Sequence, residues 1–127
     1  MDFSFYNRQR KYSFDLTFVR SMAELAEDAC RRAAKTPDAP LLSLDSLEVS
    51  ILSDAAIAKV HGELLIGAGV ITENAAEYGQ SPTEECALCV IHGMLHLAGW
   101  DDLTAREAKE MKVRQEQIFK MARKVLR

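Results

Sequence analysis

The segment from Cys86 to Leu97, C-A-L-C-V-I-H-G-M-L-H-L, is apolar nearly all round. A helix of that composition is stable only where neighbouring elements cover its sides, so the segment predicts a helix buried in the middle of a domain. The run Ser81-Pro82-Thr83-Glu84 in front of it combines an N-cap serine, a first-turn proline and a capping-box glutamate, and Gly99 ends the pattern. The rest of the chain therefore has to be arranged around one helix.

Length and composition are consistent with one domain spanning residues 1–127. Of the 127 residues, 48% are hydrophobic, which is enough for a core without disulfides. The formal net charge of −3 is close to neutral, so the overall charge is not that of a nucleic-acid binder, and basic clusters have to be considered one by one. The expected fold class is α+β, with a small mixed sheet packed against several helices around the central buried helix.

The first half of the chain shows alternating and helical apolar patterns. Alternation predicts strands at residues 2–7 and 47–52. Helical spacing of apolar residues predicts an amphipathic helix at 15–34, and the two prolines in 35–40 end it.

The second half begins with weaker patterns. Ser53 is a suitable N-cap for a helix from residue 54 to about residue 64. The glycine-interrupted run 65–71 predicts the remnant of a strand that leads into a short helix ending at Tyr78.

A last helix begins after Thr104, where Thr104 and Glu107 repeat the capping-box pattern. Its expected inner stripe consists of Ala108, Met111, Gln115, Ile118, Phe119, Ala122 and Leu126.

Targeting signals and disulfides are not expected. The amino terminus lacks an apolar stretch of signal-peptide length, and no run elsewhere approaches the ~20 apolar residues that span a bilayer. We therefore expect a cytoplasmic protein without membrane association. The three cysteines, Cys30, Cys86 and Cys89, are an odd and sparse set, and we expect them to be reduced and mostly buried.

The two imidazoles of the buried helix, His92 and His96, are its only strongly polar side chains. Residues four apart on a helix lie one turn apart and about 40° round the axis, so both rings can point to one ion roughly 2.0–2.1 Å from each nitrogen. A single histidine on an apolar helix is more often a hydrogen-bonded core residue, but a pair at this spacing favours a metal ion. The expected cofactor is one divalent ion per chain, with zinc as the first candidate.

A third ligand is expected from the loop after the helix, Gly99-Trp100-Asp101-Asp102. A chain reversal there can present one of the two carboxylates to the ion, and Asp102 is the best candidate, with Asp101 as the alternative. Three protein ligands leave a fourth position for water, as in catalytic zinc sites. Position 93 is glycine, where zinc peptidases of the H-E-x-x-H type need glutamate as general base, so peptide hydrolysis by that route is disfavoured.

A structural zinc site that also uses Cys86 and Cys89 is the main alternative. Helix geometry disfavours it, because Cys89 and His96 are separated by about 10 Å along the axis at ~1.5 Å per residue, too far for one ion.

The residues H-G-M-L-H-L-A-G-W-D-D at 92–102 resemble the H-G-x-L-H-L-x-G-Y-D-H signature of the YbeY-type endoribonucleases, the bacterial rRNA maturation factors. The resemblance continues upstream through E-N-A-A-E-Y-G-Q-S-P-T-E-E and downstream into the last helix, and more weakly back to 47–64. It therefore spans most of the chain.

This resemblance implies a single α+β or α/β domain in which the three histidines of the motif hold zinc. Carried over to this sequence, it makes His92 and His96 metal ligands. The third histidine of the motif falls at Asp102, whose carboxylate is an ordinary zinc ligand, although the exchange weakens the advantage of zinc over manganese. Trp100 stands where the family usually has tyrosine, and Asp101 matches the motif's aspartate, which we interpret as orienting a ligand.

One departure from the family lies between Glu63 and Val70. The family carries a further segment there, with a T-D-V-L-S-F-like strand and a nearby basic residue implicated in activity. The run 61–67, H-G-E-L-L-I-G, has the form of a junction between a helix end and a later strand. The segment is either naturally deleted or omitted from the sequence, and a natural loss would remove one wall of the cleft and abolish RNA cleavage while sparing metal binding.

The predicted function is that of a metal-dependent endoribonuclease that cleaves single-stranded RNA in 16S rRNA maturation and ribosome quality control, with ribosomal RNA or ribosomal particles as partners and no DNA. The alternatives are a metal-dependent hydrolase with another substrate and a ribosome-associated assembly protein with a vestigial metal site. Basic side chains that either hold RNA or form an ordinary solvated surface are Arg8, Arg10, Lys11, Lys112, Arg114, Lys120, Arg123, Lys124 and Arg127.

Overall fold

A four-stranded mixed sheet forms one layer of the molecule. Its strands, in spatial order, are β1 (Asp2–Asn7), β2 (Ser46–Leu52), β4 (Glu63–Gly67) and β3 (Ala58–Val60). β1, β2 and β4 run parallel, and the short β3 pairs with the outer edge of β4 in the antiparallel direction. The computed structural model describes residues 1–53, 58–60 and 63–126.

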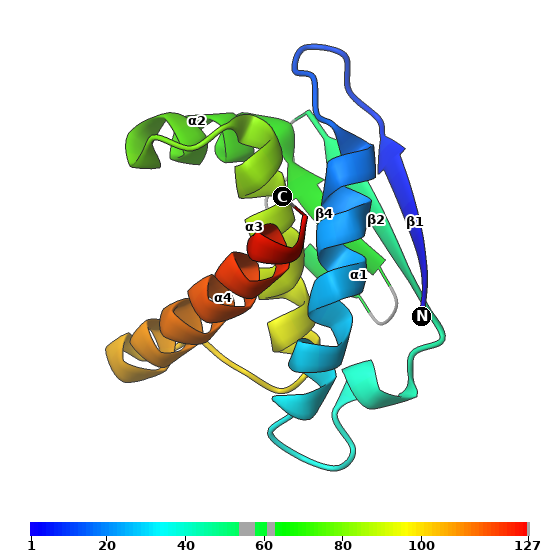
Figure 1. Cartoon of the computed structure of the whole chain (residues 1–127), viewed down its shortest axis with the longest axis vertical. Helices are drawn as coiled ribbons and strands as arrows, with labels where there is room; N and C mark the ends of the chain where they lie inside the picture. Colours follow the sequence, from blue (N-terminus) through cyan, green and yellow to red (C-terminus); the bar gives the residue numbers. More distant parts are fainter. Residues whose placement is uncertain (54–57, 61–62, 127) are drawn as a thin grey trace.

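Helices form the second layer (Figure 1). α1 (Leu16–Arg32) contacts β1, and α3 (Pro82–Leu97) contacts β4. α4 (Ala105–Val125) packs on α1 and α3 on the side away from the sheet, and α2 (Ala68–Tyr78) leads from the end of β4 back to α3. A short 3₁₀ helix, η1 (Pro40–Ser43), precedes β2. The arrangement confirms the expected α+β class and the central position of the histidine helix.

The sheet is apolar on the face that the helices cover. Leu47, Val49 and Ile51 of β2 are at most 1% exposed, and the parallel register places Val49 beside Leu64 and Ile51 beside Ile66. Successive side chains of a strand point to opposite faces, so this one row fills the space between sheet and helices. The helix layer is thereby held over β2 and β4, the middle strands of the sheet.

The opposite face of the sheet carries polar side chains around Arg8. Arg8, which follows β1, donates from Nε to Ser50 Oγ at 3.3 Å and lies 3.6 Å from the Glu48 carboxylate. Its guanidinium carbon also lies 4.7 Å from the centre of the Tyr6 ring. Arg8 is therefore held on the side of the sheet away from α3.

The two helix starts predicted from capping boxes, at Ser81 and Thr104, are confirmed. Ser81 Oγ accepts from the Glu84 backbone N–H at 3.1 Å, and the Glu84 carboxylate accepts from the Ser81 N–H at 3.3 Å, which completes the capping box of α3. Thr104 and Glu107 form the same box at the start of α4. Each box satisfies backbone donors that a helix end otherwise leaves without partners.

The helix predicted from residue 54 to about residue 64 is wrong where the structure describes it. Ala58–Val60 and Glu63–Gly67 are strands, and residues 54–57 and 61–62 of that prediction lie outside the described residues. Because β4 runs parallel to β2, the connection has to run back along the sheet, and β3 does so while pairing with the edge of β4. Of the run 65–71 expected as the remnant of a strand, residues 65–67 lie in β4 and residues 68–71 form the first turn of α2, which ends at Tyr78 as predicted.

The predicted inner stripe of α4 is correct in its centre and wrong at its ends. Met111, Ile118 and Ala122 are buried, whereas Ala108 is exposed and Leu126 is 40% exposed, because α4 extends beyond the elements it packs against. Within the described residues, no helix combines the length and hydropathy that a membrane span requires.

Replacing Gly93 with alanine tests the packing of α3 on β4. A Cβ atom at position 93 would lie 2.8 and 2.9 Å from the two terminal carbons of Leu64, whose side chain is 1% exposed. We expect the free energy of unfolding to fall by about 1–2 kcal/mol, because overpacking a closed core outweighs the gain of ~1 kcal/mol that alanine has over glycine in a helix. Urea unfolding followed by circular dichroism measures the difference.

Gly69→Ala is the matched control, since Gly69 is also helical and a Cβ atom there meets nothing within 4 Å. This variant should be as stable as the unaltered chain or more stable. A Gly93→Ala chain as stable as the Gly69→Ala chain would contradict the close approach of α3 to β4.

Candidate metal centre

The two imidazoles of α3 lie side by side at the end of the helix that is nearest to the α3–α4 loop. The Nε2 atoms of His92 and His96 are 3.0 Å apart, and the ring planes are inclined at 76°. The side chain of His96 is 9% exposed and that of His92 is 27% exposed. The pair is therefore buried on the His96 side and open to solvent on the His92 side.

The chain reverses direction immediately after α3. Gly99, with a φ of 97°, adopts the left-handed conformation that glycine tolerates best. The N–H of Gly99 donates to the His96 carbonyl at 3.0 Å and the N–H of Trp100 donates to the Leu95 carbonyl at 3.0 Å, which is the Schellman pattern of helix ends. This turn directs the following residues back toward the histidines.

Trp100 attaches this turn to α1. Its indole Nε1–H donates to the Ala33 carbonyl at 2.8 Å, and the backbone N–H of Lys35 donates to the Ala98 carbonyl at 2.8 Å. The Lys35 ammonium lies 4.0 Å from the centre of the Trp100 ring, and the Arg114 guanidinium carbon lies 5.5 Å from it. Trp100 therefore holds the loop in place from a position between α1 and α4.

The loop places Asp102 beside both imidazoles. Asp102 Oδ2 is 3.5 Å from His92 Nε2 and 3.5 Å from His96 Nε2. Among the described residues, His92, His96 and Asp102 form the group of donors that can share one ion, and Asp101 is outside it. Asp101 instead lines a small cavity with Lys35, Trp100 and Glu110.

The spacing of the three donors fits a tetrahedral ion. Two ligands of a tetrahedral zinc ion at roughly 2.0–2.1 Å are about 3.3–3.4 Å from each other. The observed separations are 3.0, 3.5 and 3.5 Å, so a point at that ligand distance from all three atoms exists just outside their plane. The donor chemistry, two imidazole nitrogens and one carboxylate oxygen, is also that of zinc sites, and the exposed sides of His92 and Asp102 leave room for a further ligand.

Gln115 of α4 orients the more exposed imidazole. His92 Nδ1 lies 2.7 Å from Gln115 Oε1, and because this oxygen only accepts, Nδ1 carries the hydrogen. The lone pair of His92 is then on Nε2, where it faces His96 and Asp102. The sequence contained a signal for this contact, since Gln115 is a polar residue in the predicted apolar stripe of α4, but its role was not predicted.

Four of the basic side chains considered for RNA binding lie in two separate regions. Arg8 lies on the far face of the sheet, whereas Lys112, Arg114 and Lys120 project from α4 near the histidines. Arg123 forms an ion pair with Glu84. Arg127 lies outside the described residues.

The cysteines are separate from the group of donors. Cys30 and Cys86 are fully buried, and burial raises the pKa of each thiol to about 12. Burial likewise raises the pKa of the Cys89 thiol. Thiols in such surroundings stay protonated and are poor metal ligands, because the thiolate is the form that binds.

The fold and the converging donors together define an α+β protein with a candidate mononuclear metal centre. Two histidines from one helix and a carboxylate from the following loop, with one side open, form the type of ligand set that metal-dependent hydrolases use.

Comparison with known proteins identifies the family. The family model described as "Endoribonuclease YbeY" matches residues 4–123 of the chain. The chain therefore belongs to the YbeY endoribonuclease family.

Individual relatives agree with this assignment. The protein named Endoribonuclease YbeY of Staphylococcus carnosus is 34% identical over 106 residues, which are 82% of this chain and 68% of the relative. That of Bacillus licheniformis is 39% identical over 72 residues, which are 57% of this chain and 45% of the relative. The chain spans about half the length of several of the curated relatives it matches.

A structural relative supports the fold. A protein of Thermotoga maritima, known from its solution structure, superimposes with a TM-score of 0.54 at 18% identity, over 94% of this chain and 88% of that protein. At this level of identity the similarity shows the shared fold alone.

Alkylation tests whether the cysteines take part in the site. At about pH 8 we expect Cys30 and Cys86 to react with iodoacetamide at least about 1000-fold more slowly in the folded chain than in urea, because burial suppresses the thiolate and blocks access. Mass spectrometry of tryptic peptides measures the extent of reaction at each residue.

Addition or removal of zinc should leave these rates unchanged. Protection of Cys86 or Cys89 that appears only with zinc would contradict the present site and favour a structural site that includes sulfur.

Proposed function

We propose that the chain binds one zinc ion through His92, His96 and Asp102. The observation that carries this proposal is the convergence of the three donors, with separations of 3.0, 3.5 and 3.5 Å. Since zinc carries two positive charges and the ligand set contains one carboxylate, the occupied site keeps a net positive charge suited to an anionic substrate. The carboxylate at position 102 also allows manganese to replace zinc in vitro.

We further propose that the protein is an endoribonuclease that hydrolyses single-stranded RNA. Membership of the YbeY family and the printed name of its relatives support this reaction. Ribosomal RNA, and 16S rRNA in particular, is the proposed substrate, with maturation and quality control of ribosomes in the cytoplasm as the setting. The whole chain, residues 1–127, is proposed to form this one domain, since α1, α3 and α4 all contribute to the site.

A bound divalent ion supplies two effects in such a reaction: it lowers the pKa of water and stabilises negative charge on phosphoryl oxygens. The residues of the chain supply the geometry. Gln115 keeps the His92 lone pair on Nε2, and the turn at Gly99 keeps Asp102 beside both imidazoles. Hydrolysis itself joins a water oxygen to phosphorus and breaks the bond from phosphorus to the departing ribose oxygen, which takes up a proton.

The short strand β3 is relevant to whether the cleft beside the candidate metal centre is complete. It lies on the outer edge of β4, so the sheet continues past β4 although the chain lacks the further segment that the family resemblance implies. We propose that the remaining sheet edge and α4 are sufficient to hold RNA near the metal centre. The rival function, a ribosome-associated assembly protein with a vestigial metal site, differs in requiring no cleavage.

Replacement of single ligands tests metal binding and catalysis together. The purified chain should contain about one zinc ion, and His92→Ala and Asp102→Ala should each lose it, because two remaining donors hold zinc weakly. Cleavage of a fluorescent single-stranded RNA should fall by at least about 100-fold in both variants. Plasma mass spectrometry measures the metal, and gel electrophoresis measures the products.

Asp101→Ala is the matched control, because this carboxylate lies outside the group of donors and lines a cavity with Lys35, Trp100 and Glu110, away from the position expected of a residue that orients a ligand. The change should leave zinc content and cleavage unchanged. Zinc retained by Asp102→Ala but lost by Asp101→Ala would reverse the assignment of the third ligand. A chain that binds zinc, leaves RNA intact and binds ribosomal particles in a salt-sensitive manner would be the assembly protein instead.

Gln115→Leu tests the contribution of α4 to the metal centre. Removal of the acceptor for His92 Nδ1–H should weaken zinc binding by about 10- to 100-fold, the usual effect of losing the partner of a ligating histidine. Competition with a fluorescent zinc chelator measures the dissociation constant.

Two further variants separate positioning from folding. Gln115→Glu keeps an oxygen acceptor and should retain the affinity for zinc. Gln117→Leu changes an exposed glutamine of the same helix and should have no effect. Equal affinities of the Gln115→Leu and Gln117→Leu chains would show that the contact with His92 does not orient the ligand.

A further inference from the structure

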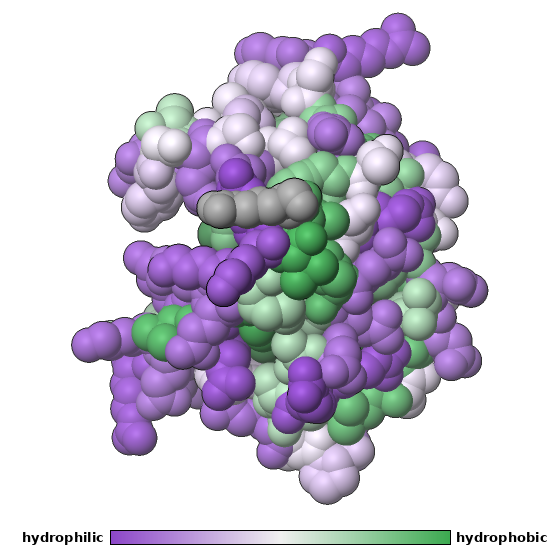
Figure 2. Space-filling view, in the orientation of Figure 1, coloured by the Kyte–Doolittle hydropathy of each residue, from purple (hydrophilic) through white to green (hydrophobic). Residues whose placement is uncertain are grey.

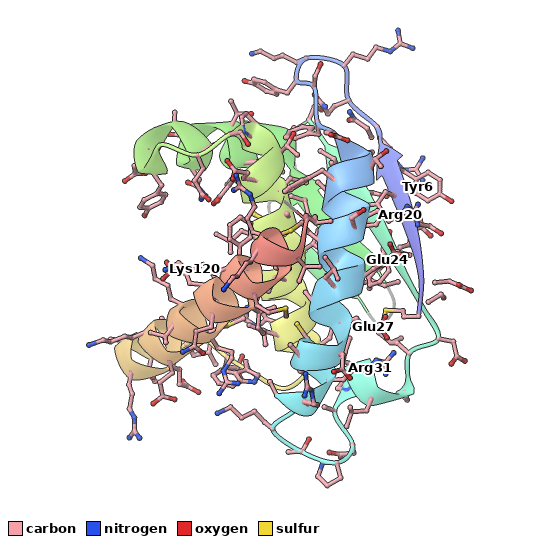
Figure 3. All side chains as sticks on the ribbon, in the orientation of Figure 1. Tyr6, Arg20, Glu24, Glu27, Arg31 and Lys120 are labelled. Carbon is pink, nitrogen blue, oxygen red and sulfur yellow. The ribbon has the colours of Figure 1, made fainter. Side chains whose placement is uncertain are left out.

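A cavity of about 490 Å³ lies next to the metal centre, at the junction of α2, α3 and α4. The end of α2 contributes Tyr78, and the residues just after it contribute Gln80. Figure 2 shows the surface hollowed between the parts formed by α2 and α4, and Figure 3 shows Lys120 of α4 projecting toward this opening. A volume of this size is typical of small-ligand sites.

The cavity and the metal centre share a wall. Leu88 lines the cavity and lies one turn before His92 on the same face of α3. On α4, Gln115 lines the cavity and also accepts the hydrogen bond from His92 Nδ1. A ligand in the cavity therefore lies beside the histidines and is not bound at a remote surface.

The walls of the cavity offer two kinds of contact. Leu88 and Phe119 are apolar, and Tyr78 is 63% exposed, so a flat ring can stack there. Gln80 donates from Nε2 to Glu85 Oε2 at 3.2 Å, which places an amide and a carboxyl group side by side in the wall. Burial raises the pKa of Glu85 above its ordinary value, and its carboxyl oxygens accept hydrogen bonds such as the one from Gln80.

Two lysines flank this surface. Lys112 and Lys120 line the cavity, and the Lys112 ammonium lies 5.8 Å from the centre of the Tyr78 ring. Within the described part of the chain, the ion pairs formed by side chains of α4 involve Arg106 and Arg123 and neither of these lysines. Glu85 and Glu116 also line the cavity, so its charge is balanced and does not suit a polyphosphate.

We propose that this cavity binds one unpaired nucleobase of the RNA, next to the nucleotide whose phosphodiester is cleaved; the proposal rests on the function proposed above. Tyr78 stacks on the base, Gln80 and Glu85 hydrogen-bond its edge, and Lys112 and Lys120 contact the adjoining phosphates. A base enters the cavity only when it is not paired with another strand. The cavity thereby selects single-stranded RNA.

Replacement of Tyr78 tests the proposal. The probe is a fluorescein-labelled single-stranded RNA pentamer, and its dissociation constant is measured by fluorescence anisotropy with Asp102→Ala chains, which bind without cleaving. Tyr78→Ala should raise the dissociation constant by about 5- to 100-fold, as expected for loss of a stacking ring. With the intact metal centre, the same change should raise KM for the pentamer more than it lowers kcat.

Matched variants show whether stacking is responsible. Tyr78→Phe keeps the ring and should bind like the parent chain. Tyr6→Ala removes another exposed tyrosine, which lies on β1 far from Lys120 in Figure 3, and should also have no effect. Zinc content and circular dichroism should be unchanged in the Tyr78 variants. A duplex of the same sequence should compete poorly with the pentamer.

The outcomes separate this proposal from the proposed function. A chain that cleaves single-stranded RNA with the same KM after Tyr78→Ala would overturn the base site and leave the nuclease intact. A chain that does not cleave RNA, yet binds the pentamer through Tyr78, would support the base site and overturn the nuclease. Failure of the parent chain to bind the pentamer at all would overturn the base site.

Discussion

The two imidazoles of α3 need polar partners, and this need explains where α4 and the loop between α3 and α4 lie. α3 contacts α1, α2, α4 and β4, so His96 has little access to bulk water and His92 is open to it on one side only, and burying polar atoms without partners costs free energy. The partners come from outside the helix: Gln115 lies on α4 and Asp102 on the loop between α3 and α4. α4 and the loop between α3 and α4 thus both place polar partners beside His92 and His96.

The third donor also depends on α1, although α1 contributes no ligand. The turn at Gly99 is held by the hydrogen bond from Trp100 to the Ala33 carbonyl and by the one from Lys35 to the Ala98 carbonyl. Both bonds use backbone groups just past Arg32, the last residue of α1, where carbonyl groups lack partners within the helix. Asp102 is therefore positioned by a connection between two helix ends, and the candidate metal centre depends on three helices.

Features encoded by neighbouring residues were predictable, and features encoded by distant contacts were not. The capping boxes at Ser81 and Thr104 and the spacing of His92 and His96 are local, and the structure has them as expected. The N-cap signal at Ser53 was equally local, but the open edge of β4 offers backbone pairing that a helix cannot supply, and β3 forms there instead. The contact between Gln115 and His92 joins residues 23 positions apart, which periodicity alone does not specify.

A carboxylate at position 102, in place of the histidine of the family motif, changes the ligand chemistry of the candidate site more than its geometry. Asp102 Oδ2 occupies a point equally distant from both imidazoles, as a third tetrahedral ligand should, yet its side chain is 41% exposed while that of His96 is 9% exposed. An exposed, charged oxygen ligand exchanges more readily with water and tolerates harder ions than an imidazole does. A carboxylate there would also cancel part of the charge of a bound ion, so an anionic ligand would depend more on the charged groups of the protein. Lys112 and Lys120, placed beside the cavity that adjoins His92, are in position to supply such groups.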